Sequence, residues 1–200
     1  MNGQESLVLR RRLERDFGFS VHPFRYPTVS TPINDVTARL QAFVQQLGPP
    51  STLHFIGHSL GGLVVYRFFE RYPDQPPGRI VFLGTPALGS LAASRVAGMR
   101  WAAPLLGRGM SAELLAEPSR KWALSRDLGI IAGTRSVGLG QFFARFNGAS
   151  DGTVAVSETR LAGATAHLTL PVSHTGMWLS ARVARETGTF LETGHFLPSN

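Results

Sequence analysis

A short apolar run followed by a serine between glycines constrains this chain more than any other feature. Leu53–Ile56 has the composition of a buried strand, and Leu60–Tyr72 that of a helix. Between them stands Gly57-x-Ser59-x-Gly61. A sharp turn from strand to helix strains the serine backbone and lifts its hydroxyl above the sheet edge. Because side chains two residues away on either side would crowd this turn, we expect glycine to be required at 57 and 61.

Ser59 at such a turn is predicted to be a nucleophile. The backbone N–H of Leu60, at the start of the helix, is expected to point to the position where an oxyanion would form. The motif alone is a weak signal, because an ordinary glycine-rich turn with a capping serine has the same letters. Its place between a strand and a helix favours the nucleophile elbow.

Composition indicates one globular domain over residues 1–200. Hydrophobic residues make up 43% of the chain and charged residues 16%, which excludes a disordered protein. The absence of cysteine excludes disulfides and thiolate metal sites, and we expect a cytoplasmic protein. The chain has no apolar stretch long enough for a transmembrane helix. Arg10–Arg12 interrupts the apolar residues near the N-terminus, so no signal core is expected.

The net charge of +7 raises the question of a nucleic-acid or membrane partner. The basic residues are arginines, apart from Lys121, and they are scattered along the chain. Their tightest cluster is Arg10–Arg12. We therefore favour a genome-wide codon preference and expect no nucleic-acid partner.

The predicted helices and strands alternate, which indicates an α/β fold. The chain is predicted to begin with a helix over Glu5–Asp16, a strand over Phe19–Tyr26 and a helix with an apolar stripe from Val36 to Leu47. Asn34 or Asp35 is the predicted N-cap of that helix. The strand and helix around Ser59 follow, then strands over Arg79–Leu83, Asp127–Ala132 and Ala166–Leu170, and a closing helix over Met177–Leu191. The opening order αβαβαβ implies right-handed crossovers and a mostly parallel sheet flanked by helices. Ligands of such sheets bind at the carboxyl ends of the strands, where Ser59 is expected.

The segment Ala87–Lys121 lacks a long helical period and is rich in small and apolar residues. It fits a short helical cap, or lid, over the site. A plain connecting helix and loop fits equally well.

A serine hydroxyl needs a base to accept its proton, and the base needs a third group to fix its tautomer. In this kind of sheet the partners follow the serine in the order acid, then histidine, each in a loop after a later strand. Asp151 and His174 satisfy this order. Glu158 is the rival acid, and an Asp-Gly turn is the bland alternative for Asp151.

The other histidines fit the role of base less well. His58 is expected to point away from the serine, and His54 and His167 lie inside predicted strands. His22 precedes the nucleophile, and His195 lies in the C-terminal tail.

Three motifs together resemble the α/β-hydrolase superfamily, in particular its small lipase- and esterase-like serine hydrolases. The motifs are Gly57-His58-Ser59-Leu60-Gly61-Gly62, Ser150-Asp151-Gly152-Thr153-Val154 and Ser173-His174-Thr175-Gly176-Met177. The resemblance covers nearly the whole chain. It implies ester hydrolysis through an acyl-serine intermediate, with Ser59, His174 and Asp151 as the triad.

The chain departs from this family at its N-terminus. The resemblance implies an apolar strand ending in His-Gly, whose following loop provides a second oxyanion donor, yet Met1–Gln4 leads directly into the first helix. We expect either that this strand is encoded ahead of Met1 or that part of the oxyanion hole is lost. Losing one donor typically costs about 10²–10³ in turnover.

The sequence therefore predicts a serine esterase acting on small-molecule or lipid esters with lipophilic acyl groups. Leu88, Leu91, Trp101, Leu105 and Leu106 are expected to contact the acyl chain. The segment Met1–Gly3 is expected to supply a second oxyanion donor. No metal or organic cofactor is expected, since the triad transfers its own proton. An acyltransferase or thioesterase with the same triad, or an inactive binding protein, are the alternatives.

Overall fold

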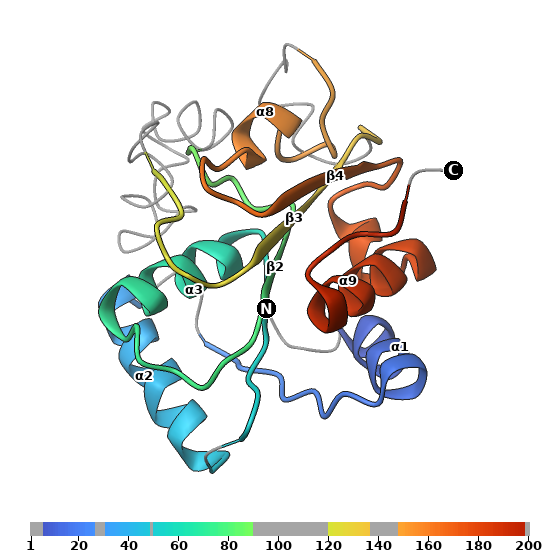
Figure 1. The fold of residues 1–200 in the computed structure, drawn as a ribbon. Coiled ribbons are helices and arrows are strands. Elements are labelled where there is room, and N and C mark those ends of the chain that lie inside the picture. The colour runs from blue at the N-terminus through green and yellow to red at the C-terminus, as the bar shows by residue number, and fades with distance from the viewer. Residues whose placement is uncertain (1–5, 27–30, 49, 90–119, 137–147, 199–200) are drawn as a thin grey trace.

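The computed structural model describes residues 6–26, 31–48, 50–89, 120–136 and 148–198 (Figure 1). Its elements, in chain order, are α1 (Leu7–Phe17), α2 (Ile33–Gln46), β1 (Phe55–His58), α3 (Leu60–Arg71), β2 (Ile80–Leu83), β3 (Leu128–Gly133), α8 (Val156–Thr159), β4 (Ala166–Leu170), the 3-10 helix η1 (Thr175–Trp178) and α9 (Ala181–Thr193).

The four strands form one parallel sheet in the order β1-β2-β3-β4. β1 pairs with β2 from Phe55 opposite Ile80 to His58 opposite Leu83. β2 and β3, and β3 and β4, pair in parallel in the same way. Because all strands run in one direction, their carboxyl ends meet at one edge of the sheet, where ligands of such sheets bind.

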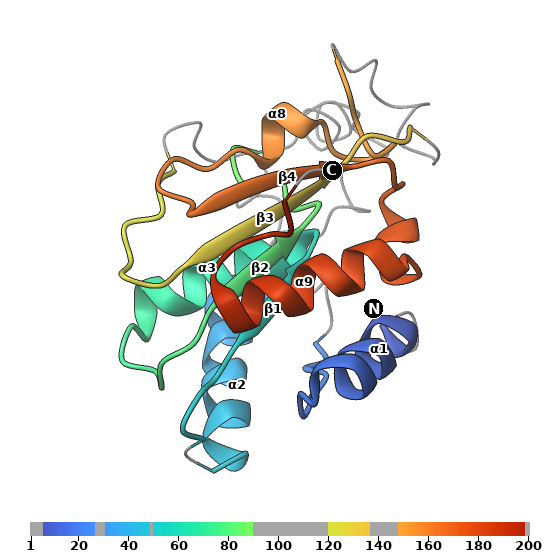
Figure 2. The ribbon, with the colours of Figure 1, turned by 45° about the vertical axis from the view of Figure 1, so that its right-hand side comes forward.

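Helices cover both faces of the sheet (Figures 1 and 2), with α2 and α3 on one face and α1 and α9 on the other. The side chains of β2 alternate between the two cores. Ile80 and Phe82 pack in the cluster on the α2 and α3 face, and Val81 and Leu83 pack in the cluster on the α1 and α9 face. All four are buried, which explains why this strand is a continuous apolar run.

Two predicted helix boundaries are wrong. The closing helix begins at Ala181 rather than Met177, because the Ser180 hydroxyl caps it by accepting the Val183 N–H at 3.2 Å. Met177 lies in the preceding 3-10 helix η1. The N-cap of α2 is Pro32, so the caps predicted at Asn34 or Asp35 are not used.

The strand predicted over Phe19–Tyr26 is also wrong. This segment has no regular structure and pairs with no strand in the part of the chain that the structure describes. Its first apolar residues, Phe19 and Val21, pack on the α1 and α9 core. Phe24 and Tyr26 pack on the α2 and α3 core. The alternation therefore reflects packing on two cores, and the chain opens with α1 and α2 rather than with helix, strand and helix.

The predicted cap, Ala87–Lys121, lies mostly outside the described residues, which resume at Arg120. Whether it is a cap or a plain connection stays a prediction. Within the described residues, no helix combines the length and the apolar character needed to cross a membrane.

Candidate active site

Ser59 occupies the turn between β1 and α3 in a strained backbone conformation. Its φ is 54° and its ψ −127°, and among the described residues it is the only non-glycine with a positive φ. Its N–H donates to the Leu83 carbonyl at 2.9 Å, and its carbonyl accepts the Gly62 N–H at 3.1 Å. Such a conformation costs on the order of 1–3 kcal/mol and persists only where the surroundings enforce it. The serine therefore lies at the carboxyl end of β1, as predicted.

Glycines beside Ser59 allow the close approach of α3 to the sheet. A Cβ at Gly57 would lie 2.5 Å from Gly62 Cα, and a Cβ at Gly62 would collide with the Thr85 hydroxyl. Among the described residues, a Cβ at Gly61 would meet nothing within 4 Å. The requirement predicted at 57 agrees with this packing. The requirement predicted at 61 is wrong, because the crowded position is 62.

His174 and Asp151 lie together at the same edge of the sheet. His174 is in the loop between β4 and η1, and its Nδ1 is 2.7 Å from Asp151 Oδ2. Asp151 is 1% exposed and His174 9% exposed. Since a buried carboxylate accepts hydrogen bonds, this contact places the proton on His174 Nδ1 and leaves Nε2 as a proton acceptor.

Asp151 is fixed by its own turn. Its Oδ1 accepts the backbone N–H groups of Thr153 at 2.9 Å and Val154 at 2.7 Å. Its backbone carbonyl accepts the His174 N–H at 2.9 Å. The aspartate thus shapes an Asp-Gly turn with one oxygen and contacts the histidine with the other, so its place in the turn does not prevent contact with His174.

Two glycines that sequence reasoning missed make room for this pair. A Cβ at Gly84, directly after β2, would lie 2.9 Å from Asp151 Oδ2 and 3.1 Å from His174 Nδ1. A Cβ at Gly133, the last residue of β3, would lie 2.7 Å from Asp151 Cβ. Gly84 follows the buried strand β2, and Gly133 ends the buried strand β3. A glycine at the end of an apolar run was the signal available in the sequence.

The side chain that connects the elbow with the histidine is His58, which sequence reasoning had set aside. Its Nε2 is 3.0 Å from the His174 carbonyl, and the two rings lie 4.6 Å apart between centroids. No hydrogen bond joins Ser59 to His174 within the described residues. Catalytic hydrogen bonds are often long in unliganded enzymes and tighten with the substrate.

Burial and the neighbouring His174 lower the pKa of His58 to about 4, so its ring is neutral near pH 7. Its Nδ1 has no hydrogen-bond partner within the described residues. Trp178 of η1 also packs against the His58 ring, with ring centroids 4.5 Å apart.

Two of the remaining histidines and the rival acid form hydrogen bonds elsewhere. His54 Nδ1 accepts the Arg79 N–H at 3.0 Å, and His167 Nε2 lies 2.9 Å from the Thr159 hydroxyl. Burial lowers the pKa of both histidines. His22 and His195 are exposed. Glu158 accepts the Ala155 N–H at 2.7 Å and thereby closes the first turn of α8.

The predicted oxyanion donor Leu60 is the first residue of α3. An N–H at this position has no acceptor inside its own helix. The second predicted donor, in Met1–Gly3, lies outside the described residues.

Of the predicted acyl-chain contacts, the structure describes Leu88, which is half-buried. Its N–H donates to the Glu158 carbonyl at 3.0 Å. The other predicted contacts, Leu91, Trp101, Leu105 and Leu106, lie outside the described residues.

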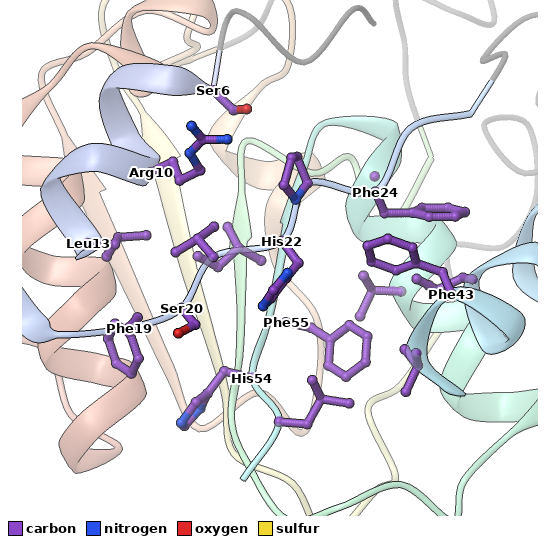
Figure 3. Close-up of a pocket in the computed structure, with 18 of the residues that line it drawn as sticks. Ser6, Arg10, Leu13, Phe19, Ser20, His22, Phe24, Phe43, His54 and Phe55 are labelled. Atoms are coloured by element: carbon purple, nitrogen blue, oxygen red, sulfur yellow. The ribbon is translucent and has the colours of Figure 1, made fainter. Parts of the chain in front are cut away.

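A cavity of about 470 Å³ lies beside β1 (Figure 3), on the strand edge that faces Phe19–Tyr26. Figure 3 shows Leu13 on α1 at one side and Phe43 on α2 at the other. Most of its lining is apolar, and it includes His58 and Gly61, which flank Ser59 in the sequence. The cavity therefore extends from the neighbourhood of the elbow into the body of the protein. Within the described residues, no cluster of three histidine or acidic side chains is arranged to hold a metal ion.

A model of the alpha/beta hydrolase family matches residues 5–197. This chain belongs to the alpha/beta hydrolase family. Membership agrees with the parallel sheet flanked by helices and with the position of the strained serine between a strand and a helix. The predicted family and fold class are thus confirmed.

Solved structures of the same fold include several hydrolases. Mature lipase BlEst2 from Bacillus licheniformis is 19% identical, with a TM-score of 0.58 over 87% of this chain and 76% of the lipase. The metagenomic carboxyl esterase MGS0156 is 19% identical, with a TM-score of 0.64 over 83% of this chain and 57% of the esterase. The thioesterase RedJ from Streptomyces coelicolor is 14% identical, with a TM-score of 0.61 over 94% of this chain and 81% of RedJ. No curated protein sequence matches this chain.

Proposed function

We propose that this alpha/beta hydrolase is a serine esterase in which Ser59 attacks the acyl carbonyl of a carboxylic ester. His174 is the base, and Asp151 orients it. The observation that carries the proposal is the 2.7 Å contact between His174 Nδ1 and Asp151 Oδ2 at the sheet edge that also presents the strained Ser59. A strained serine and a buried acid–histidine pair are costly to hold, and acyl transfer uses both.

In the acylation step, Ser59 Oγ forms a bond to the acyl carbon while its proton passes to His174 Nε2. The imidazolium that forms is stabilised by Asp151, whose carboxylate stays ionised. His174 then protonates the leaving alcohol, the bond from carbon to the alcohol oxygen breaks, and an acyl-serine remains.

In the deacylation step, water replaces the alcohol. His174 Nε2 accepts a proton from water as the water oxygen attacks the acyl carbon, and it returns the proton to Ser59 Oγ when the acid leaves. The Leu60 N–H stabilises the oxyanion in both steps. A donor from Met1–Gly3 would complete the oxyanion hole.

Lipophilic acyl groups are the substrate class that we propose. The cavity beside β1 is mostly apolar and begins beside the elbow, so an acyl chain attached to Ser59 would replace water there. Each buried methylene contributes about 0.8 kcal/mol. A separate proposal is that the acyl chain contacts Leu91, Trp101, Leu105 and Leu106.

Hydrolysis of p-nitrophenyl esters tests the assigned roles. Ser59→Ala and His174→Ala are expected to remove turnover. Asp151→Asn is expected to keep its fold and lower kcat by about 10⁴, because the amide stabilises the wrong tautomer of His174. Glu158→Gln is the matched control and should retain turnover. A large loss in Glu158→Gln, with activity kept in Asp151→Asn, would identify Glu158 as the acid.

A cavity-filling variant tests the acyl site. Val21 lines the cavity, so Val21→Trp should raise KM for octanoate esters while butanoate esters are little affected. Arg25→Trp, an exposed position on the same segment, is the control. If Leu105→Ala changes the chain-length preference and Val21→Trp does not, the acyl chain binds at the predicted cap instead.

A thioesterase or acyltransferase is the second candidate, favoured by the structural likeness to the thioesterase RedJ. A thioesterase would use the same triad to hydrolyse a thioester. An acyltransferase would use it to transfer the acyl group to an alcohol. Turnover of acyl thioesters, and analysis of products with added alcohol, distinguish these activities from ester hydrolysis. An inactive binding protein would show no turnover of either substrate.

A further inference from the structure

The structure holds the backbone of His174 from two sides. On one side, the Asp151 carbonyl accepts the His174 N–H at 2.9 Å. On the other, the His174 carbonyl lies 3.0 Å from His58 Nε2. Because a carbonyl can only accept, the proton of this hydrogen bond is on His58 Nε2, and Nδ1 carries the lone pair. His58 is therefore a donor to the main chain of the proposed base.

His58 is also attached to the nucleophile. It is the last residue of β1 and directly precedes Ser59, and its side chain is 6% exposed. Its ring contacts both His174 and Trp178, with centroid distances of 4.6 and 4.5 Å. A shift of His174 would therefore push on His58, and a shift of His58 would move the residue that carries the attacking oxygen.

We propose that His58 is a positioning residue that sets the separation between Ser59 and His174 through its Nε2–H hydrogen bond to the His174 carbonyl. The proposal rests on the proposed function of Ser59 and His174. Asp151 controls the orientation and tautomer of the His174 ring, whereas His58 controls where the His174 main chain sits relative to the elbow. A misplacement of about 1 Å between reacting groups can cost about 10²-fold in rate.

The charge of His58 is consistent with this role. The ionisable groups near its ring are His174 and Asp151. When His174 becomes an imidazolium during acylation, a second positive ring at 4.6 Å would oppose it. Burial keeps His58 neutral, so it donates its hydrogen bond without adding a charge beside the base.

Two substitutions separate the hydrogen bond from the packing. His58→Phe keeps a flat ring in contact with His174 and Trp178 but removes the donor. His58→Gln restores an N–H donor of similar reach. We expect kcat for a p-nitrophenyl ester to fall about 10–100-fold in His58→Phe with KM changed less than about threefold, and to recover most of that loss in His58→Gln. His167→Phe, which removes a hydrogen-bonding histidine from β4, should change kcat less than about twofold.

Wild-type kcat in His58→Phe would overturn the proposal. So would an equal loss of kcat in His58→Gln and His58→Phe when both unfold at the same denaturant concentration, because packing alone would then explain the effect. Absence of turnover in the folded wild type is a different outcome, which overturns the esterase function and the positioning role with it.

A measurement on the unmodified protein covers the case in which His58→Phe does not fold. Nitrogen-15 spectra of histidine-labelled protein, assigned with His58→Gln, report the tautomer of each ring. We expect His58 to be the neutral Nε2–H tautomer at pH 7. A His58 signal from the Nδ1–H tautomer or from an imidazolium would contradict the hydrogen bond and overturn the proposal.

Discussion

The two edges of β1 are built differently. One edge pairs with β2 over the whole strand, from Phe55 opposite Ile80 to His58 opposite Leu83. The other edge faces a cavity of about 470 Å³ and the segment Phe19–Tyr26, which is not a strand. The paired edge holds Ser59 in place through the Leu83 carbonyl. The open edge provides space beside the same serine.

This difference suggests a division of roles within one strand. The paired edge provides the rigidity that a strained nucleophile requires, and the open edge provides room for a substrate. His58 belongs to both, because its backbone pairs with Leu83 and it is one of the residues that line the cavity. For apolar side chains, stability should therefore respond more strongly to truncation on the paired side than on the open side.

The largest effect is expected from protonation of His58. Its pKa is about 4 in the folded protein, below its ordinary value of about 6.5. As pH falls from 6.5 to 4, the unfolded chain binds this proton and the folded chain does not, so stability is lost over that interval. The loss is about 3 kcal/mol. Urea unfolding at several pH values should show this loss of stability in the wild type and not in His58→Phe. Parallel pH curves for the two proteins would contradict the burial of a neutral His58.

The next effect concerns the close packing of α3 against the paired side. Gly62→Ala would press a methyl group into the buried Thr85 side chain, and overpacking of this kind costs about 1–3 kcal/mol. Among the described residues, Gly61→Ala meets nothing within 4 Å, and a helical alanine is favoured over glycine by up to about 1 kcal/mol. Urea unfolding of the two variants should therefore give changes of opposite sign. Equal destabilisation would mean that the crowding lies at 61 as well.

The last comparison concerns two valines, one on each side of β1. Val81 of β2 is 0% exposed, so Val81→Ala should lower the free energy of unfolding by about 1.5–3 kcal/mol. Val21 lines the cavity and is half-buried, so Val21→Ala should cost less than about 1 kcal/mol. Chemical denaturation measures both. If Val21→Ala were as costly as Val81→Ala, the open edge would be packed as tightly as the paired one.

The same contrast explains what the sequence could predict. The strand–serine–helix unit was predictable because its signals are local, namely an apolar run, two glycines and an apolar helix. The contact between Asp151 and His174 was predictable because the proposed chemistry requires an acid and a histidine in loops after later strands. Their hydrogen bond joins residues from two loops that the strand order brings together.

The failures depend on contacts between distant residues. Phe19–Tyr26 alternates like a strand, but a strand also needs a neighbour to pair with, and alternation does not report one. The contact of His58 with His174 depends on how the end of β1 packs against the loop before η1, and the sequence around His58 does not indicate it. The need for glycine at 62 rather than 61 depends on Thr85, which lies in the loop after β2.

The most direct test of the central claim is the intact mass of the protein after incubation with a fluorophosphonate. The reagent forms a covalent bond with an activated serine and leaves other serines unmodified. We expect one adduct on the wild type and none on Ser59→Ala. No adduct on folded wild-type protein, or an adduct that persists in Ser59→Ala, would contradict the claim that Ser59 is an activated nucleophile.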